Sequence, residues 1–302
     1  MSENKIGFVG IGNMGGPMAA NLVRAGRKVV VFDINPDQAR KFADEHGTEA
    51  AATLAELGAA VEVVISMLPN GHDVRHMMLE QEDGGLVRSL KAGSLLIDMS
   101  SSDPIGTREL GKALEEYSIQ LVDAPVSGGV PGAVDGSLAI MIGGDDSAAI
   151  ERARPILSDM GKRLFETGPL GSGHAMKALN NIVAGAGFAA ISEALITGQK
   201  FGLEPAVMID ILNSSTGRSF NSEYTFGSHV LNSSFASGFA LALCCKDVKI
   251  AADLAKGQGL ETPVLQMVSE RWQKAGQGLG AGKDFTEAYA FWEKVIKPGQ
   301  DK

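Results

Sequence analysis

The sequence has few cysteines and no excess of positive charge. Only 2 of its 302 residues are cysteine, Cys244 and Cys245. Their adjacency is poor geometry for an ordinary disulfide, which fits a reducing cytoplasm. Acidic residues outnumber basic ones by 36 to 27, giving a formal net charge of −9. Because phosphate binding needs clustered Lys and Arg, we expect no nucleic-acid partner.

The sequence also lacks an obvious membrane segment. Its long apolar stretches are interrupted by Gly, Asn and Glu before they reach about 18 residues, so no transmembrane helix is expected. The first residues, MSENKIGFVG, contain no basic region, no apolar region of signal length and no cleavage site. These features predict a cytoplasmic protein without a membrane partner.

Short β-rich runs alternate with helical patterns in the first half of the chain. Strands are expected at residues 6–10, 28–33, 61–66, 94–99, 119–124, 138–143 and 163–166, with helices between them such as 14–25, 36–45 and 104–117. Continuous aliphatic runs such as VEVVIS and SLLIDM are typical of strands covered on both faces of a parallel sheet. The repeated strand–helix–strand order predicts a doubly wound α/β domain.

The second half of the chain has only helical patterns. A Gly-rich segment, TGPLGSG, is interpreted as a hinge, and residues 174–201 follow it as one long helix that is too apolar for a surface position. Further helices are expected at 205–213, 247–258, 263–275 and 286–295. We therefore predict a dinucleotide-binding Rossmann-like domain at 1–166 and an all-α domain at 167–302 that opens with a long buried helix.

A glycine-rich loop separates the first expected strand from the first helix. Its sequence is Gly10-Ile11-Gly12-Asn13-Met14-Gly15. In a loop of this spacing Gly10 permits the tight turn, Gly12 lets the backbone approach a pyrophosphate, and Gly15 lets helix and strand pack closely. The helix N-terminus adds N–H donors for the phosphates. The alternative is a tight turn that binds no ligand.

Asp33 ends the second expected strand, 18 residues beyond Gly15. A carboxylate at this place accepts hydrogen bonds from the adenosine ribose hydroxyls. It would repel a 2′-phosphate, and Ile34 and Asn35 offer no cation to offset that repulsion. NAD is therefore favoured over NADP, although Arg40 and Lys41 lie one or two turns further on. A plain turn residue is the alternative for Asp33.

Five segments of the sequence have to be considered together: GFVGIGNMGGPMAANL, MLPN, DAPVSGG, GSGHAMKALNN and GFALALCCKD. Together they resemble the β-hydroxyacid dehydrogenases, a family that includes 3-hydroxyisobutyrate dehydrogenase, tartronate semialdehyde reductase and 2-(hydroxymethyl)glutarate dehydrogenase. They follow the family's order and spacing over nearly the whole chain. The resemblance implies an NAD(P)-dependent enzyme acting on CH–OH donors, with a Rossmann-like domain, a helical domain, and homodimers or homotetramers.

Lys177 is the candidate general acid and base. It lies among apolar residues in the long helix, and burial or nearby positive charge lowers the pKa of a lysine towards a range useful for proton transfer. The matching lysine of the family is its catalytic acid/base. Asn181, four residues on, shares its helix face and could orient Lys177 or bind the substrate hydroxyl, as the family counterpart is thought to do. The alternatives are that Lys177 is an ordinary solvated lysine and that Asn181 is a polar residue at a helix–helix contact.

The resemblance implies roles for further residues. Ser127, Gly128 and Gly129 would bind the substrate carboxylate, and a turn of this kind can form an anion nest. Phe239 would wall the substrate pocket, Asp247 would orient neighbouring groups, and Lys246 would approach the cofactor. The remaining expected cofactor contacts are Leu68, Pro69, Asn70 and either Ser100 or Ser101. The alternatives are a structural turn for the SGG segment, a capping pair at a helix start for Lys246 and Asp247, and a core aromatic for Phe239.

A monocarboxylate substrate needs only one anion-binding group, which the SGG segment already supplies. Arg218 is therefore not needed to bind such a substrate. It could hold a second polar or anionic group, or form a structural ion pair. His72 and His76 have a spacing that can hold zinc, but no third ligand is apparent. Cys244 and Cys245 are expected to act as small apolar bulk. We therefore expect no metal site.

These features predict interconversion of a small β-hydroxy acid and its semialdehyde or keto form, with 3-hydroxyisobutyrate the first candidate. Tartronate semialdehyde, a hydroxymethyl dicarboxylate, threonate and sulfonated analogues are alternatives within the same family. A dinucleotide-binding module without catalysis is the alternative from another class. An imine reductase and a 6-phosphogluconate dehydrogenase fit less well, because Lys177 disfavours the first, and the chain length and Asp33 disfavour the second.

Overall fold

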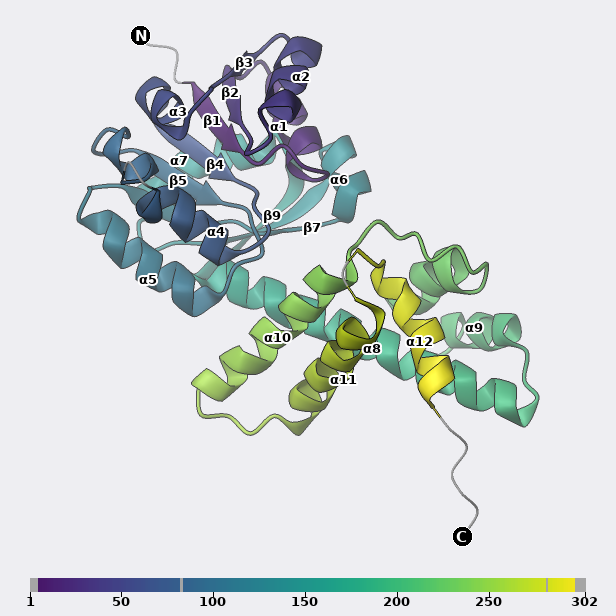
Figure 1. Cartoon of the computed structure of the whole chain (residues 1–302). Coiled ribbons are helices and arrows are strands. Elements are labelled where there is room, and N and C mark those ends of the chain that lie inside the picture. The colour runs from purple at the N-terminus through teal and green to yellow at the C-terminus, as the bar shows by residue number, and fades with distance from the viewer. Residues whose placement is uncertain (1–4, 82–83, 281, 297–302) are drawn as a thin grey trace. The chain divides into compact units, whose positions relative to one another are not determined.

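The computed structural model describes residues 5–81, 84–280 and 282–296. The chain forms two compact units, an N-terminal unit that ends at Lys177 and a C-terminal unit that starts at Ala178 (Figure 1). The described strands of the N-terminal unit are β1 Ile6–Val9, β2 Val29–Phe32, β3 Glu49–Ala50, β4 Val63–Ser66, β5 Leu95–Asp98, β6 Gln120–Asp123, β7 Val126–Ser127, β8 Leu138–Gly143 and β9 Gly161–Gly168. The two shortest strands, β3 and β7, were not expected from the sequence.

All described strands form one sheet in the order β3-β2-β1-β4-β5-β6-β8-β7, with β9 beside β8. The strands from β3 to β6 are parallel, which confirms the doubly wound architecture. The sheet is not parallel throughout, because β8 runs antiparallel to β6 and β7 and parallel only to β9. The direction reverses after Gly136, which ends the preceding helix in the left-handed conformation.

Helices cover both faces of the sheet in the N-terminal unit (Figure 1). They are α1 Gly15–Arg24, α2 Pro36–His46, α3 Leu54–Ala60, α4 Gly71–Arg75, the π-helix η1 His76–Glu80, the 3₁₀ helix η2 Leu86–Arg88, α5 Pro104–Glu115, α6 Gly129–Asp135 and α7 Ser147–Ser158. Neighbouring strand residues point to opposite faces, so Phe8 belongs to one buried apolar cluster and Val9 to another. The aliphatic runs in the sequence therefore do mark strands buried on both sides.

The C-terminal unit is built from helices. Its elements are most of α8 Ser172–Phe201, then α9 Pro205–Asn213, the π-helix η3 Asn221–Val230, α10 Leu241–Gly257, α11 Pro263–Leu279, the 3₁₀ helix η4 Phe285–Glu287 and α12 Ala288–Val295. The expected helix start at residue 247 is wrong. Ala240 pairs with Asp284 in an isolated bridge, and Leu241 N–H donates to the Lys283 carbonyl, so α10 begins six residues earlier.

Helix α8 is long and apolar enough to cross a membrane by length and composition alone, which the sequence reasoning did not expect. The core helix of a folded domain passes the same test, and α8 is buried on one face rather than throughout. Phe188 on the buried face contacts Phe226 and Trp272, with ring centroids 4.9 and 5.7 Å apart. Val183 and Phe201 lie on the exposed side. This helix is the apolar centre of the C-terminal unit.

Candidate functional site

The glycine loop between β1 and α1 has two positions that packing reserves for glycine. Gly10 has a φ of +93°, and a Cβ there would lie 2.5 Å from the Met67 carbonyl oxygen. A Cβ on Gly15 would lie 1.8 Å from the carbonyl oxygen of Gly10. A Cβ on Gly12, in contrast, would meet nothing within 4 Å. The loop therefore leaves room beside Gly12, as the approach of a pyrophosphate requires.

The N-terminus of α1 is open to such a ligand. Met14 at the N-cap makes no side-chain capping bond, and Gly12 and Asn13 are exposed. The first N–H groups of a helix have no partner within the helix and carry the positive end of its dipole. The loop and this helix start together fit the phosphates of a dinucleotide.

Asp33 ties the end of β2 to the glycine loop. Its Oδ2 accepts a hydrogen bond from Ile11 N–H at 2.8 Å, and its Oδ1 accepts from Asn35 N–H at 2.9 Å. The Gln38 side chain donates to the Ile11 carbonyl from the other side. A carboxylate has about four lone-pair sites, so Asp33 retains acceptor capacity for ribose hydroxyls. Arg40 pairs with Asp37.

The ends of β4 and β5 are joined through Ser100. Leu68 N–H donates to Ser100 Oγ at 2.9 Å, and Ser100 N–H donates to Asp98 Oδ1 at 3.0 Å. Ser100 is completely buried, whereas Ser101 is partly exposed. Asn70 caps α4 by accepting from Asp73 N–H at 2.9 Å, and Pro69 is exposed. The Ser100 hydroxyl thus holds the ends of β4 and β5 together. Of the two serines, Ser101 is the one that is more accessible to a cofactor.

The SGG segment forms a glycine-dependent turn at the end of β7. Gly128 has a φ of +136° and Gly129 a φ of +60°, both values that L side chains rarely adopt. Ser127 is partly exposed, and both glycines are exposed. The turn is compatible with the predicted carboxylate-binding role, because consecutive backbone N–H groups in turns can form an anion nest.

Lys177 and Asn181 lie one turn apart on α8, which runs unbroken through both positions. Lys177 is half-buried, and the neighbouring Met176 and Leu179 are exposed, so this stretch is less buried than expected. Asn181 Nδ2 donates to Asp247 Oδ2 at 2.6 Å. The Lys246 Nζ lies 2.9 Å from Asp247 Oδ1.

Asp247 therefore brings Asn181 and Lys246 together in the C-terminal unit. Its carboxylate is buried and faces both partners, an arrangement compatible with the predicted orienting role. Both residues of the Lys246–Asp247 pair lie inside α10, so the alternative of a capping pair at a helix start is wrong. Phe239 packs edge-on against Phe285, with ring centroids 5.8 Å apart.

Arg218 has a partner of its own. Its Nε lies 2.7 Å from Glu223 Oε1, and both side chains are largely exposed. This contact agrees with the ion-pair alternative, and a substrate role for Arg218 stays a prediction. In the part of the chain that the structure describes, no group of three or more His, Cys, Asp or Glu could hold a metal ion. His72 and His76 stack at a centroid distance of 6.4 Å on an exposed surface.

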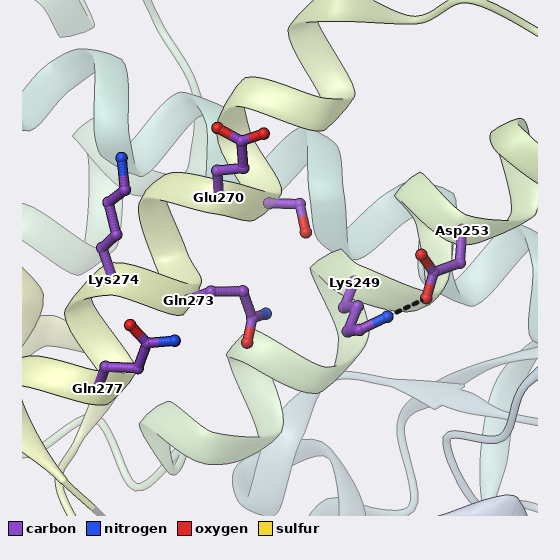
Figure 2. Close-up of a pocket in the computed structure, with 7 residues that line it drawn as sticks. Lys249, Asp253, Glu270, Gln273, Lys274 and Gln277 are labelled. Carbon is purple, nitrogen blue, oxygen red and sulfur yellow. Dashed lines mark hydrogen bonds and ion pairs between the residues drawn. The ribbon is translucent and has the colours of Figure 1, made fainter.

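A shallow hollow of about 330 Å³ lies between α10 and α11 (Figure 2). The residues that line it are Lys249, Asp253, Ser269, Glu270, Gln273, Lys274 and Gln277. Lys249 pairs with Asp253 across one helical turn. None of the residues expected at the site lines this hollow, so it adds nothing to the assignment.

Sequence reasoning missed three buried polar side chains near the predicted site. Asp98 ends β5, Asp123 ends β6, and His174 lies in the first turn of α8, with exposed fractions of 2%, 0% and 1%. A signal was present, because SLLIDM and IQLVDA each place an aspartate at the carboxyl end of a buried strand. Ligands bind near these ends in doubly wound folds, so a charge there deserves a functional reading.

Two family models cover almost the whole described chain. Residues 5–168 match the NAD-binding domain of 6-phosphogluconate dehydrogenase, and residues 171–292 match the NAD-binding domain of NADP-dependent 3-hydroxyisobutyrate dehydrogenase. The sequence is 36% identical to 2-(hydroxymethyl)glutarate dehydrogenase of Eubacterium barkeri, covering 96% of this chain and 95% of the relative. It is 38% identical to 3-hydroxyisobutyrate dehydrogenase of Pseudomonas aeruginosa, covering 86% and 88%.

Solved structures agree with these matches. Mycobacterium tuberculosis 3-hydroxyisobutyrate dehydrogenase, solved with L-serine, has a TM-score of 0.85 at 34% identity and covers 95% of this chain and 98% of its own. A Streptomyces aurantiacus imine reductase, with a TM-score of 0.63 at 18% identity, covers 98% of this chain and all of its own and shares the fold alone. The chain therefore belongs to the β-hydroxyacid dehydrogenase family of NAD(P)-dependent enzymes that act on CH–OH donors.

Proposed function

We propose that this dehydrogenase uses NAD to oxidise a small β-hydroxy acid, with 3-hydroxyisobutyrate the first candidate, and that Lys177 is its general acid and base. The observation that carries the proposal is the placement of Lys177 and Asn181 one turn apart on α8, with Asn181 held by Asp247 at 2.6 Å. The relative from Pseudomonas aeruginosa acts on 3-hydroxyisobutyrate by name, and the solved relative was captured with L-serine, itself a β-hydroxy acid.

In this mechanism Ser127, Gly128 and Gly129 bind the substrate carboxylate. A bound nicotinamide dinucleotide supplies the hydride acceptor. The Lys177 Nζ takes the proton of the substrate hydroxyl during oxidation and returns it during reduction. Asn181 holds the hydroxyl, and its amide is fixed because Nδ2 is committed to Asp247. Positioned proton transfer of this kind contributes about 10²- to 10⁴-fold to the rate.

The preference for NAD rests on Asp33. Its carboxylate accepts the loop N–H of Ile11 at 2.8 Å, which places negative charge beside the glycine loop. Ile34 is almost fully exposed, and Arg40 is already paired with Asp37. A 2′-phosphate at this position would meet the Asp33 carboxylate, and Lys41 pairs with Glu45. Titration with NAD and with NADP measures the preference, and tighter binding of NADP contradicts it.

The central test is the substitution Lys177→Ala. We expect binding of NAD to persist and kcat to fall by about 10²- to 10⁴-fold, because only proton transfer is removed. Lys200→Ala is the matched control, since Lys200 is an exposed lysine on the same helix. The reaction is followed as NADH absorbance with 3-hydroxyisobutyrate, tartronate semialdehyde, 2-(hydroxymethyl)glutarate, threonate and sulfonated analogues. Near-normal turnover by Lys177→Ala contradicts the mechanism, and no turnover of any panel member by the unaltered enzyme contradicts the substrate class.

The proposal includes a homodimer or homotetramer in the cytoplasm, without a membrane or nucleic-acid partner. Its support is the apolar surface left on α8 and α9, where Val183 is 71% and Phe201 84% exposed and Val207 and Ile211 are exposed as well. Several exposed apolar side chains on neighbouring elements are more often found in a protein interface than on a free surface. Light scattering coupled to size exclusion measures the mass in solution, and a mass of about 31.5 kDa excludes a stable oligomer.

A further inference from the structure

The buried polar cluster of Asp98, Asp123 and His174 lies where β5, β6 and α8 meet in the N-terminal unit. All three residues are at most 2% exposed. Burying charged or polar groups costs free energy unless their partners compensate for it. The proton-transfer mechanism above uses none of these residues, so the cluster needs an explanation of its own.

Asp123 caps the helix that carries Lys177. Its Oδ1 accepts from Gly171 N–H and its Oδ2 from His174 N–H, each at 2.8 Å. These N–H groups have no partner within the helix, and a carboxylate is favoured at the positive end of the helix dipole. Because Asp123 belongs to β6, 48 residues before Gly171, this cap is a tertiary contact that fixes α8 to the sheet.

Gly173 in the first turn of α8, and Gly171 just before the helix, pack against the backbone of β8 and of α5. A Cβ on Gly173 would lie 2.4 Å from the Met141 carbonyl oxygen and 2.8 Å from Asp123 Oδ2. A Cβ on Gly171, where φ is +85°, would lie 2.7 Å from the Pro104 carbonyl oxygen. The TGPLGSG segment, interpreted from the sequence as a hinge, is therefore a close-packed junction on this side.

The His174 ring extends this attachment to α5. Its Nδ1 lies 2.8 Å from Thr107 Oγ1, and the Thr107 hydroxyl lies 2.9 Å from the Asp103 carbonyl oxygen. A carbonyl can only accept, so both contacts are hydrogen bonds only in the tautomer in which the single hydroxyl proton of Thr107 points to Asp103 and Nδ1 donates a proton to Thr107. This tautomer satisfies both contacts.

The other ring nitrogen of His174 faces the end of β5. Nε2 lies 3.6 Å from Asp98 Oδ2 and makes no hydrogen bond. Asp98 accepts from the hydroxyls of Ser66 and Ser102, both at 2.9 Å. The imidazole thus fills the space between α5, β5 and β6 with one directional bond, the bond to Thr107.

We propose that His174 is a positioning residue that fixes Lys177 for proton transfer through the bond from its Nδ1 to Thr107. Lys177 lies three residues further along α8, about one turn away, so displacement of the first turn displaces its amine. An error of about 1 Å in the placement of a reacting group can cost about 10²-fold in rate. This inference rests on the proposed function of Lys177.

Two amide substitutions separate the roles of the ring nitrogens. In His174→Asn the side-chain amide lies near the position of Nδ1 and can still donate to Thr107, whereas in His174→Gln it lies near that of Nε2. We expect kcat to fall about 10- to 100-fold in His174→Gln and in Thr107→Val, with the Kd for NAD and the KM for 3-hydroxyisobutyrate nearly unchanged. His174→Asn should keep most of its kcat.

Equal kcat values in His174→Asn and His174→Gln, each corrected for the folded fraction, would overturn the proposal, because a purely structural role does not distinguish the two nitrogens. The proposed function fails separately, if Lys177→Ala keeps its turnover. If Lys177→Ala is inactive while His174→Gln and Thr107→Val keep full kcat, only the positioning role is wrong.

A measurement without substrate tests the bond itself. The other four histidines, at 46, 72, 76 and 229, are exposed or half-exposed, so their ring protons exchange quickly with water. In protein labelled with ¹⁵N-histidine we expect one slowly exchanging ring N–H, at Nδ1 of His174, which Thr107→Val abolishes. A ¹⁵N shift that shows Nδ1 without a proton would overturn the proposal even if the variants failed to fold.

Discussion

The two units hold their candidate site residues by different means. In the N-terminal unit the backbone itself is in close contact, as where a Cβ on Gly15 would lie 1.8 Å from the Gly10 carbonyl oxygen. In the C-terminal unit side chains hold one another beside an aromatic core, as where Asn181 Nδ2 donates to Asp247 Oδ2 at 2.6 Å. Backbone contacts tolerate almost no added atom, whereas a side-chain bond can weaken by degrees.

The aromatic core of the C-terminal unit explains this second mode. Phe188 contacts Phe285 and Trp292 at centroid distances of 5.2 and 6.0 Å, and both Trp272 and Trp292 are buried. Such a core fixes the helix axes by packing, while the polar side chains on its edge are fixed only by each other. Substitutions in the glycine loop should therefore either strongly reduce the free energy of unfolding or leave it nearly unchanged. Substitutions around Asp247 should instead lower kcat by degrees.

The largest expected effect is that of Gly15→Ala. The added methyl group overlaps the Gly10 carbonyl, so the start of α1 must move away from β1. We expect the free energy of unfolding to fall by more than about 4 kcal/mol, a loss that reduces the yield of folded protein. Urea unfolding followed by circular dichroism measures it.

Gly12→Ala is the matched control within the same loop. Its methyl group would meet nothing within 4 Å, so stability should change by less than about 0.5 kcal/mol. The methyl group would instead occupy the space expected for the pyrophosphate, and the Kd for NAD should rise at least about tenfold, a loss of about 1.4 kcal/mol. Similar stability losses in both variants would contradict a distinction between packing and ligand space.

A smaller, kinetic effect is expected for Asp247→Asn in the C-terminal unit. The substitution keeps the shape of the side chain but removes the charge that holds Asn181 and Lys246. We expect kcat to fall about tenfold, since a hydrogen bond to a charged group is worth about 1.5–3 kcal/mol. Steady-state kinetics with NAD and 3-hydroxyisobutyrate measure it.

Asp253→Asn provides the comparison for Asp247→Asn. Asp253 lies on the same helix, is exposed and pairs with Lys249, and exposed pairs contribute at most about 1 kcal/mol to stability and nothing to this mechanism. A kcat for Asp253→Asn as low as that for Asp247→Asn would show that charge on α10, rather than the bond to Asn181, controls the rate.

The sequence was most informative where structure depends on local pattern. The glycine spacing and the aliphatic runs predict the loop, the strands from β1 to β6 apart from β3, and the change to helices, because each depends on residues within one or two turns or strands. The start of α10 was misplaced because Ala240 is paired with Asp284, 44 residues away. The cap of α8 by Asp123 was missed for the same reason, since 51 residues separate that carboxylate from His174.

The smallest expected effects concern the two cysteines, which test whether the core of the C-terminal unit is apolar. Cys244 and Cys245 are buried and form no disulfide, and burial, followed by the charges of Cys245 and Asp247, raises the pKa of Cys244 well above its usual range. Burial also raises the pKa of Cys245. Because the thiolate is the reactive form, both thiols should resist a thiol reagent at pH 8 in the native protein and react at once in denaturant. Rapid labelling of the native protein would contradict an apolar core.

These raised pKa values also fix the sign of a pH dependence. An unfolded thiol loses its proton near pH 8.5, whereas the folded Cys244 keeps its proton, so the folded state binds more protons above that pH. The free energy of unfolding therefore falls as the pH rises, by about 0.4 kcal/mol per thiol at pH 8.5 and more at higher pH. Cys244→Ala should flatten this slope in urea unfolding between pH 7 and 9.5. An unchanged slope in the variant would assign the pH dependence to other groups and contradict a raised pKa of the Cys244 thiol.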